Sequence, residues 1–208
     1  LRPEQREAID LAKGHFCKRS GRKGEYEWTP EKGFRQFLWN AKMRFGKTLS
    51  ALEVIRRRGF NRTIIVTHRP VVDKGWYEDF SKIFHFESTS YMYGSRDKGT
   101  DLLTMENACA LGKAKYIYFA SMQDLRGTDK VGGKFAKNDK VFSTKWDCVI
   151  VDEAHEGTQT TLGKNVLNAL TENKPKVLQL SGTPFNLFDQ YKEDEIFTWD
   201  YVMEQKAK

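Results

Sequence analysis

The sequence has no long hydrophobic run, no secretory signal pattern and only three cysteines, and each absence removes a class of protein. Its apolar runs are a few residues long, whereas a membrane-spanning helix needs about 20. The N-terminus shows no positive charge followed by an apolar stretch, so we expect no signal peptide. The cysteines, Cys17, Cys109 and Cys148, are odd in number and widely spaced, which favours a reducing, cytoplasmic setting.

Metal clusters of cysteine and histidine are also missing from the sequence. The cysteines and the four histidines do not lie at the spacings of a zinc site, so we expect no zinc. There is no internal repeat and no low-complexity segment. These features leave an ordinary globular domain as the starting hypothesis.

The composition is sufficient for one packed domain. The chain has 208 residues, of which 39% are hydrophobic and 13% aromatic, which fits one sizeable domain better than two. It begins at Leu1 without an initiator methionine, and we expect it to be a piece of a longer protein. Lysine and arginine exceed the acids by 35 to 28. The resulting charge of +7 modestly favours a polyanionic partner, although many ordinary domains are equally basic.

Strand-like and helix-like segments alternate along the whole chain. Apolar or β-branched runs predict strands at 34–39, 62–67, 88–93, 116–120, 148–151 and 176–180. Helical spacing predicts helices at 1–12, 49–55, 71–84, 101–111 and 158–170. This alternation predicts an α/β fold with a mostly parallel, doubly wound sheet and helices on both faces.

Three further stretches do not follow this alternation of strands and helices. Residues 15–32 and 127–140 are rich in glycine and basic residues, and we interpret both as surface loops. Residues 185–208 are aromatic and acidic and then helical in pattern. We expect a domain at 1–184 and, at 185–208, a segment that leads toward further polypeptide.

The strand at 148–151 ends in two adjacent carboxylates, Asp152 and Glu153, followed by Ala154 and His155. Ionised groups are costly to bury unless they bind something. Ligands collect outside the carboxyl ends of strands in open α/β sheets. We therefore expect these acids to face a site that suits Mg²⁺ and a polarised water molecule, rather than to cap the surface.

A second polar strand end lies at residues 40–48, which finish in Gly46, Lys47 and Thr48 before a helix. A strand, a loop and a helix in this order form the setting of a phosphate-binding loop, where backbone N–H groups hold an anion. Lys47 is then expected to reach the phosphates, and Thr48 to bind Mg²⁺. The alternative is a Gly-Lys-Thr run that merely starts a helix.

The fit to the general phosphate-loop pattern is incomplete. Ala41 stands at the first glycine position, and Arg44 and Phe45 occupy the middle of the loop. A non-glycine side chain at a position that needs positive φ costs on the order of 1 kcal/mol or more. The loop must therefore follow a different path or tolerate strain.

Polar residues follow three more predicted strands. Arg69 follows the second strand, Ser121 and Gln123 follow the fourth, and a Ser-Gly-Thr-Pro run at 181–184 follows the last. A basic residue such as Arg69 at a strand end can meet a nucleic-acid phosphate, although a solvated turn is the simpler interpretation of Arg69 alone. For Gln123 the two interpretations are about equal.

Taken together, the motifs at residues 1–6, 46–48, 152–155 and 181–184 resemble the first RecA-like motor domain of superfamily 2 helicases of the DEAH type. The resemblance spans nearly the whole chain, and it is nearest to the R (Res) subunits of type III and type I restriction enzymes. It implies a P-loop NTPase fold, ATP and Mg²⁺ as cofactors, and ATPase activity that depends on nucleic acid.

The resemblance also implies a role for each matching residue. Lys47, Asp152, Glu153 and His155 would act in catalysis, with Thr48 and Asp152 on the metal and Glu153 on the attacking water. Nucleotide binding would use Gln5 for adenine, together with Gly46, Lys47, Thr48, Ser181 and Thr183. His155, Ser181 and Thr183 would also couple the nucleotide to the track, and Arg69, Ser121 and Gln123 would touch nucleic acid.

The predicted function is the ATP-binding half of a DNA translocase or helicase motor, with duplex DNA favoured as the track. Motors of this type need a second RecA-like domain, which 208 residues cannot also hold, so the isolated chain should hydrolyse ATP poorly. A nuclease or methylation module could accompany the motor; a membrane partner is not expected. Two alternatives stay open at this point: a non-hydrolysing nucleotide sensor or scaffold with an altered loop, and an RNA helicase motor.

Overall fold

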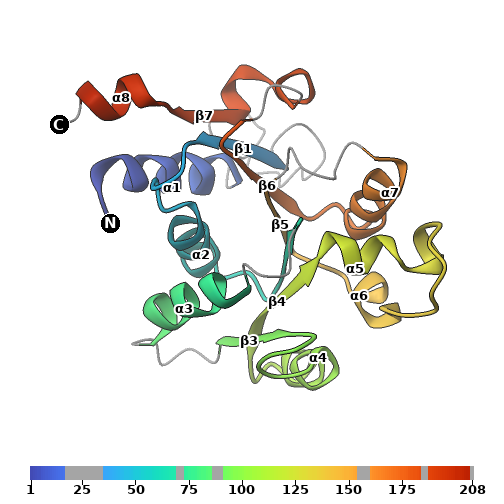
Figure 1. Cartoon of the computed structure of the whole chain (residues 1–208). Coiled ribbons are helices and arrows are strands. Elements are labelled where there is room, and N and C mark those ends of the chain that lie inside the picture. The colour runs from blue at the N-terminus through green and yellow to red at the C-terminus, as the bar shows by residue number, and fades with distance from the viewer. Residues whose placement is uncertain (17–34, 69–72, 86–90, 154–159, 184–186, 207–208) are drawn as a thin grey trace, which may run out of the picture.

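A seven-stranded parallel sheet forms the centre of the protein in a computed structural model, which describes residues 1–16, 35–68, 73–85, 91–153, 160–183 and 187–206. The strands are β1 (Gln36–Ala41), β2 (Arg62–Thr67), β3 (Tyr91–Ser95), β4 (Lys115–Ser121), β5 (Cys148–Asp152), β6 (Lys176–Ser181) and β7 (Ile196–Trp199). Their order is β3-β4-β2-β5-β6-β1-β7, and every pairing is parallel (Figure 1). The predicted α/β fold is confirmed.

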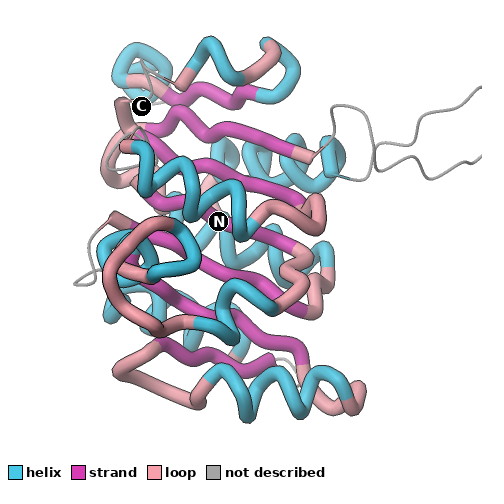
Figure 2. The backbone as a smooth tube through the Cα atoms, turned by 90° about the vertical axis from the view of Figure 1, so that its right-hand side faces the viewer, coloured by secondary structure: helices cyan, strands magenta, loops and turns pink. Residues whose placement is uncertain are grey.

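Helices cover both faces of this sheet. They are α1 (Pro3–Phe16), α2 (Lys47–Arg58), α3 (Asp73–Phe84), α4 (Leu102–Ala110), α5 (Met122–Arg126), α6 (Asp139–Ser143), α7 (Thr161–Leu170) and α8 (Tyr201–Lys206). Helices α1 to α3 lie on one side and α4 to α7 on the other (Figure 1), and Figure 2 shows the strands between the two layers of helices. Three 3₁₀ turns, η2 (Asp129–Val131), η3 (Phe188–Gln190) and η4 (Glu193–Glu195), complete the described connections.

The strands carry apolar side chains on both faces because both faces are covered. Along β1, Phe37 and Trp39 point into the core under α1 to α3, while Leu38 between them points into the core under α4 to α7. Residues that alternate along a strand point to opposite faces. Near-continuous apolar strands are therefore typical of a buried parallel sheet.

Three sequence interpretations need correction. Helix α1 continues through His15 and Phe16, which we expected in a loop, because both are buried against the core and His15 lies 5.1 Å from the Phe37 ring. Residues 127–140 contain η2 and the start of α6 as well as loop. The loop expected at 17–32 lies outside the described residues.

The third correction concerns the C-terminal segment. Residues 196–199 form β7, which pairs with β1 at the edge of the sheet, whereas we expected only a helix after residue 184. The helix follows as α8. A four-residue edge strand gives too short a pattern to recognise alone. That this segment leads to a second domain stays a prediction.

No helix in the described ranges is both long and apolar enough to cross a membrane.

Candidate nucleotide site

The carboxyl ends of β5, β6 and β1, which are neighbours in the sheet, meet at one edge. The last residues of these strands are Asp152, Ser181 and Ala41. Ligands of open α/β sheets bind outside such strand ends. The tertiary structure therefore brings together the acidic motif, the Ser-Gly-Thr turn and the start of the phosphate loop.

The phosphate loop, residues 42–46, joins β1 to α2 and holds two residues in the left-handed conformation. Gly46 has φ of 83° and Arg44 has φ of 68°. Left-handed backbone costs a non-glycine residue roughly 1–2 kcal/mol. The loop therefore tolerates strain at Arg44, which is one of the two outcomes expected from the sequence.

Phe45 anchors the loop to the core. Its side chain is buried, and its ring centroid lies 5.9 Å from that of Phe197 and 6.4 Å from those of Trp39 and Trp199. The Lys42 amide also donates to the Trp199 carbonyl at 3.4 Å. The large residue that departs from the family pattern thus packs the loop against β1 and β7.

Two side chains from the N-terminal segment hold the carbonyl groups of the same loop. The Arg2 guanidinium Nη2 donates to the Arg44 and Phe45 oxygens at 2.7 and 2.6 Å. The Gln5 Nε2 donates to the Phe45 oxygen at 2.9 Å. Hydrogen bonds from a charged donor are stronger than neutral ones. Arg2 and Gln5 therefore compensate part of the strain in the loop.

Gln5 lies against the loop, with only 6% of its surface exposed. Its Oε1 accepts from the Arg2 amide at 2.8 Å. A Cβ on Gly46 would stand 2.4 Å from Gln5 Nε2, so the end of the Gln5 side chain would have to move, and the φ of Gly46 by itself favours glycine. The proposed adenine contact of Gln5 stays a prediction.

Lys47, the first residue of α2, lies among all three strand ends. Its Nζ donates to the Ala41 oxygen at 2.6 Å, and a Cβ on Gly182 would stand 3.9 Å from Nζ. Burial lowers the pKa of Lys47, and the nearby charges of Glu153 and Asp152 oppose that shift. An amine held close to two acids fits a group that binds phosphate beside a metal ion.

The Asp152 carboxylate accepts one hydrogen bond on each oxygen. Trp76 Nε1 donates to Oδ2 at 3.1 Å, and the Glu153 amide donates to Oδ1 at 3.0 Å. Burial is the main cause that raises the pKa of Asp152; the charge of Glu153 adds to it, while Trp76 and Lys47 oppose it. Glu153 itself has φ of 52°, a left-handed turn directly after the strand.

The donor chemistry of this edge fits Mg²⁺. Within the described residues there is no group of three His, Cys, Asp or Glu side chains that could hold a metal alone. Mg²⁺ commonly uses only one or two protein oxygens and completes its shell with phosphates and water. The Asp152 carboxylate and the hydroxyl of Thr48, the second residue of α2, are oxygen donors of that kind.

Of the remaining predicted residues, some lie in the described part of the chain and others do not. Ser181 is fully buried, and its Oγ accepts from the Thr183 amide at 3.1 Å, which folds the turn beside Lys47. His155 and Arg69 lie outside the described residues, as does the proline of the 181–184 motif.

Ser121 and Gln123 lie at the carboxyl end of β4, on the other side of β2 from the acids. The Ser121 hydroxyl accepts from the Asp124 amide and so begins α5, while Gln123 is exposed. Both line a pocket of about 390 Å³ that also contains Arg96 and Lys137. These two cations pair with Asp124 at 2.8 and 2.6 Å. Contact with nucleic acid here stays a prediction.

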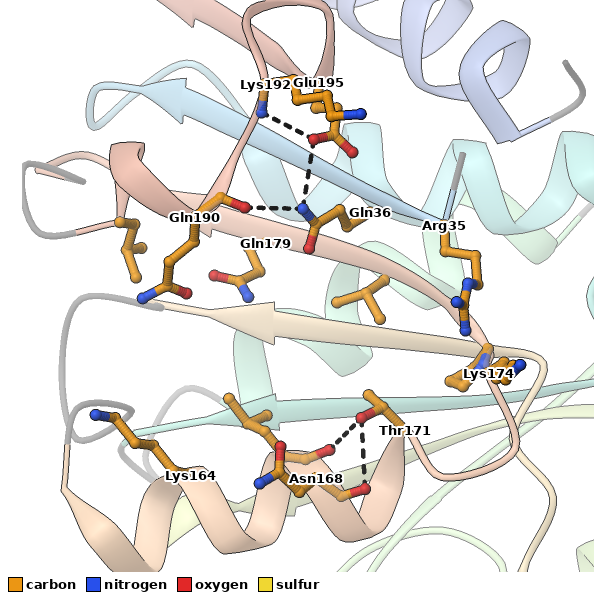
Figure 3. A pocket seen from close by; sticks show the side chains of 14 residues that line it. Arg35, Gln36, Lys164, Asn168, Thr171, Lys174, Gln179, Gln190, Lys192 and Glu195 are labelled. Atoms are coloured by element: carbon orange, nitrogen blue, oxygen red, sulfur yellow. Dashed lines mark hydrogen bonds between the residues drawn. The ribbon is translucent and has the colours of Figure 1, made fainter. Parts of the chain in front are cut away.

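A larger pocket, of about 640 Å³, lies elsewhere in the fold. It runs beside α7 and the segment 187–195, and Figure 3 shows Gln36 bonded there to the Gln190 carbonyl and to Glu195. None of the predicted site residues lines it. The larger pocket therefore does not coincide with the candidate site at the strand ends.

Sequence reasoning missed Arg2, Trp76 and Trp199. Arg2 acts through two hydrogen bonds and Trp76 through one, all to residues far along the chain. Packing against the apolar core accounts for the position of both tryptophans but not for the indole hydrogen bond of Trp76. Periodicity reports which face is buried, and it carries no signal for such bonds.

Comparisons with known proteins identify a family and relatives of the same fold. The family described as "Type III restriction enzyme, res subunit" matches residues 1–186. A Mycoplasma pneumoniae protein, named as a candidate type II restriction enzyme and methyltransferase (C-terminus), is 25% identical over 224 residues. That match covers 88% of this chain and 30% of the relative, so the chain spans under a third of the relative's length.

Solved structures show the same fold. The UvsW helicase from bacteriophage T4 has a TM-score of 0.54 and 15% identity, over 93% of this chain and 67% of that one. The Sulfolobus solfataricus SWI2/SNF2 ATPase core domain has a TM-score of 0.55 and 17% identity, over 91% and 33%. The fold is thus the RecA-like fold of helicase motor domains, and with the match over residues 1–186 the chain belongs to the type III restriction enzyme res-subunit family.

Proposed function

We propose that this chain is the ATP-binding half of an ATP-dependent DNA translocase or helicase motor, in a restriction-modification or related DNA-processing protein. One observation carries the proposal: Lys47, at the start of α2, bonds to the Ala41 carbonyl at the end of β1 and lies close to Asp152 and Glu153 at the end of β5. Phosphoryl transfer to water asks a protein for positioning and charge neutralisation more than for covalent chemistry.

The nucleotide would lie across the start of α2. Gly46 and the first amides of α2 would hold the phosphates, because a helix N-terminus presents free N–H groups and favours negative charge. Lys47 would exchange its bond to the Ala41 carbonyl for the phosphates. Gln5 would recognise adenine from beside the loop.

Asp152 and Glu153 would have separate roles, one toward the metal ion and one toward the attacking water. Asp152 and Thr48 would hold Mg²⁺, which supplies positive charge to the phosphates when it is bound. Glu153 would orient the attacking water and accept its proton. Because Asp152 keeps one hydrogen bond on each oxygen, it presents its remaining lone pairs in a fixed direction.

The track and the partners form a second part of the proposal. His155, Ser181 and Thr183 would couple the nucleotide to the track, and Arg69, Ser121 and Gln123 would contact phosphates of the nucleic acid. A second RecA-like domain would close the cleft and supply an arginine. The named Mycoplasma pneumoniae relative, which pairs restriction with methylation, supports a nuclease or methylation module.

A non-hydrolysing sensor is the alternative that a specific observation favours, because Arg44 strains the phosphate loop. The bonds from Arg2 and Gln5 and the packing of Phe45 argue against it, since they maintain the loop despite that strain. The RNA helicase alternative shares every motif, so the choice of nucleic acid in the assay must decide it.

The decisive experiment measures ATP hydrolysis by the natural full-length protein with duplex DNA, single-stranded DNA and RNA. We expect the largest stimulation with duplex DNA, and we expect the 208-residue chain alone to turn over slowly. Lys47→Ala should abolish nucleotide binding. Glu153→Gln should retain binding and lose hydrolysis by about 100-fold or more.

Lys113→Ala and Glu172→Gln are matched controls, because both residues are exposed and lie outside the site. Equal rates with and without all three nucleic acids would reject the motor. Wild-type behaviour of both site variants would reject the residue assignment.

A further inference from the structure

We propose that Trp76 is a positioning residue for the reaction, which fixes the orientation of the Asp152 carboxylate through its indole N–H. The inference rests on the proposed function, because Asp152 is a metal ligand only in that proposal. Trp76 itself lies outside the matching motifs. Trp76 lies in the first turn of α3 and is 1% exposed.

The geometry supports orientation rather than simple contact. The indole donates to Oδ2 and the Glu153 amide to Oδ1, so each carboxylate oxygen has one fixed donor. Rotation of the carboxylate would break both bonds. Indole has one donor and no acceptor, so it cannot adapt by exchanging roles. One lone pair on each oxygen stays available for a metal ion or for a water bound to it.

Packing alone does not explain this bond. Trp39 is equally buried in the same apolar core, and its Nε1 has no hydrogen-bond partner among the described residues. The core of this protein therefore accepts a buried indole without pairing its N–H. The pairing of Trp76 with the proposed metal ligand is a specific feature of the site.

The first turn of helix α3, which carries Trp76, is also held in place by hydrogen bonds. Asp73, its first residue, accepts from the Tyr93 hydroxyl at 2.6 Å and from the Ser95 hydroxyl at 2.8 Å, both on β3. The start of α3 is thus bonded to β3 on one side and to the end of β5 on the other. A rigid donor of this kind can hold a carboxylate in one direction.

The test measures the affinity of the protein for a fluorescent ATP analogue, with Mg²⁺ and with EDTA, in wild type and Trp76→Phe. We expect the Mg²⁺-dependent gain in affinity to fall by about 10-fold or more, the range seen when residues that orient metal ligands are removed. Affinity in EDTA should stay within about twofold, because the phosphate loop is unchanged.

Trp146→Phe is the matched control. Its indole is also buried and donates to the Val141 carbonyl at 2.9 Å, remote from the carboxyl end of β5. This substitution removes the same atoms and the same type of bond, so it should leave the Mg²⁺ dependence unchanged. An equal loss in both variants, or no loss in Trp76→Phe, would overturn the role of Trp76.

A second measurement does not depend on the folding of the variant. In wild type with ¹⁵N-labelled tryptophan, the Nε1–H resonance of Trp76 should shift when Mg²⁺ and nucleotide bind, and that of Trp146 should not. An unshifted Trp76 resonance would contradict the inference. Wild type that binds no nucleotide at all would instead reject the proposed function, which is a different result.

Discussion

The phosphate loop and the acidic end of β5 face each other across the proposed site, yet they are held by different kinds of contact. The loop takes its support from distant parts of the chain: Arg2 and Gln5 on its carbonyls, and Phe197 and Trp199 of β7 around Phe45. The acidic end is fixed by its own strand, by the amide of the next residue and by one indole.

The supports differ because the two regions carry different energetic costs, backbone strain in the loop and desolvation at the acid. The loop carries an arginine in a left-handed conformation, and strain persists only where the surrounding structure over-determines it. The acid must resist desolvation, which two well-placed hydrogen bonds partly offset. The loop should therefore respond to changes in core packing that leave the acids in place.

The largest effect is expected from removing the anchor of the loop. Phe45→Ala leaves a cavity among the rings of Trp39, Phe197 and Trp199 and should lower the free energy of unfolding by about 3–5 kcal/mol. Urea denaturation measures this change. Phe135→Ala, at a residue that is 62% exposed, should change stability by less than about 0.5 kcal/mol. Equal losses would show that Phe45 is no anchor.

A second effect should come from the contact between Gly46 and Gln5. Gly46→Ala places a Cβ 2.4 Å from Gln5 Nε2 at a φ of 83°, and should cost about 2 kcal/mol or more. The double variant Gly46→Ala with Gln5→Ala removes the clash. Its loss of stability should therefore be smaller than the sum of the two single losses by at least about 0.5 kcal/mol.

The control for this cycle is Gly112→Ala, at a φ of 69° with nothing within 4 Å of the new Cβ. It should report the backbone cost alone, about 1 kcal/mol. Strict additivity of Gly46→Ala and Gln5→Ala would mean that the loop relaxes away from Gln5, against the arrangement described above.

A smaller effect concerns the helix that begins with Lys47. Glu53 on α2 accepts from Arg56 and Arg57, and Arg57 also reaches Asp10 on α1. Burial opposes ionisation of Glu53, but the hydrogen bonds from the two guanidinium groups outweigh it and lower its pKa below the ordinary value of 4.5. The ionised glutamate therefore stabilises the fold at neutral pH.

Glu53→Gln should accordingly lower the free energy of unfolding at pH 7 by about 1–2 kcal/mol. A depressed pKa of an acid contributes stability above the unfolded value, and this contribution is lost as the pH falls through the folded value. The difference between wild type and variant should thus shrink as the pH falls below 4.5. The exposed Glu172→Gln should show no such convergence.

The smallest effect is expected from relieving the strain of the loop. Arg44→Gly should raise the free energy of unfolding by up to about 1 kcal/mol, because glycine takes a left-handed conformation without steric cost. Lys174→Gly, at an exposed residue with φ of 55°, should give a similar gain away from the site. If Arg44→Gly lowers the free energy of unfolding while Lys174→Gly raises it, the Arg44 side chain makes a stabilising contact. Thermal unfolding measures both variants.

Much of the fold was predictable because its signals are local. Apolar runs and helical spacing gave the strands and helices, and β2 spans the residues predicted for it. The juxtaposition of Lys47 with Asp152 and Glu153 followed from one rule, that polar residues at parallel strand ends meet at one edge. These features need only short windows of sequence and general packing rules.

The supports of the site were not predictable in that way. Phe45 departs from the family pattern, and nothing in its neighbourhood shows that β7 will pack against it. Trp76 fits the apolar face of a helix, so its hydrogen bond leaves no trace in the pattern. Each partner lies scores of residues away, and single contacts of this kind carry no periodic signal.

The sequence by itself determined the class of fold and which polar residues stand at the strand ends, since periodicity and residue type are local properties of the chain. Only the tertiary structure decided how a loop with Arg44 and Phe45 keeps its shape and what directs the Asp152 carboxylate. The physical reason is that both depend on close packing and on hydrogen-bond geometry between distant segments, which are set only when the sheet and its helices come together.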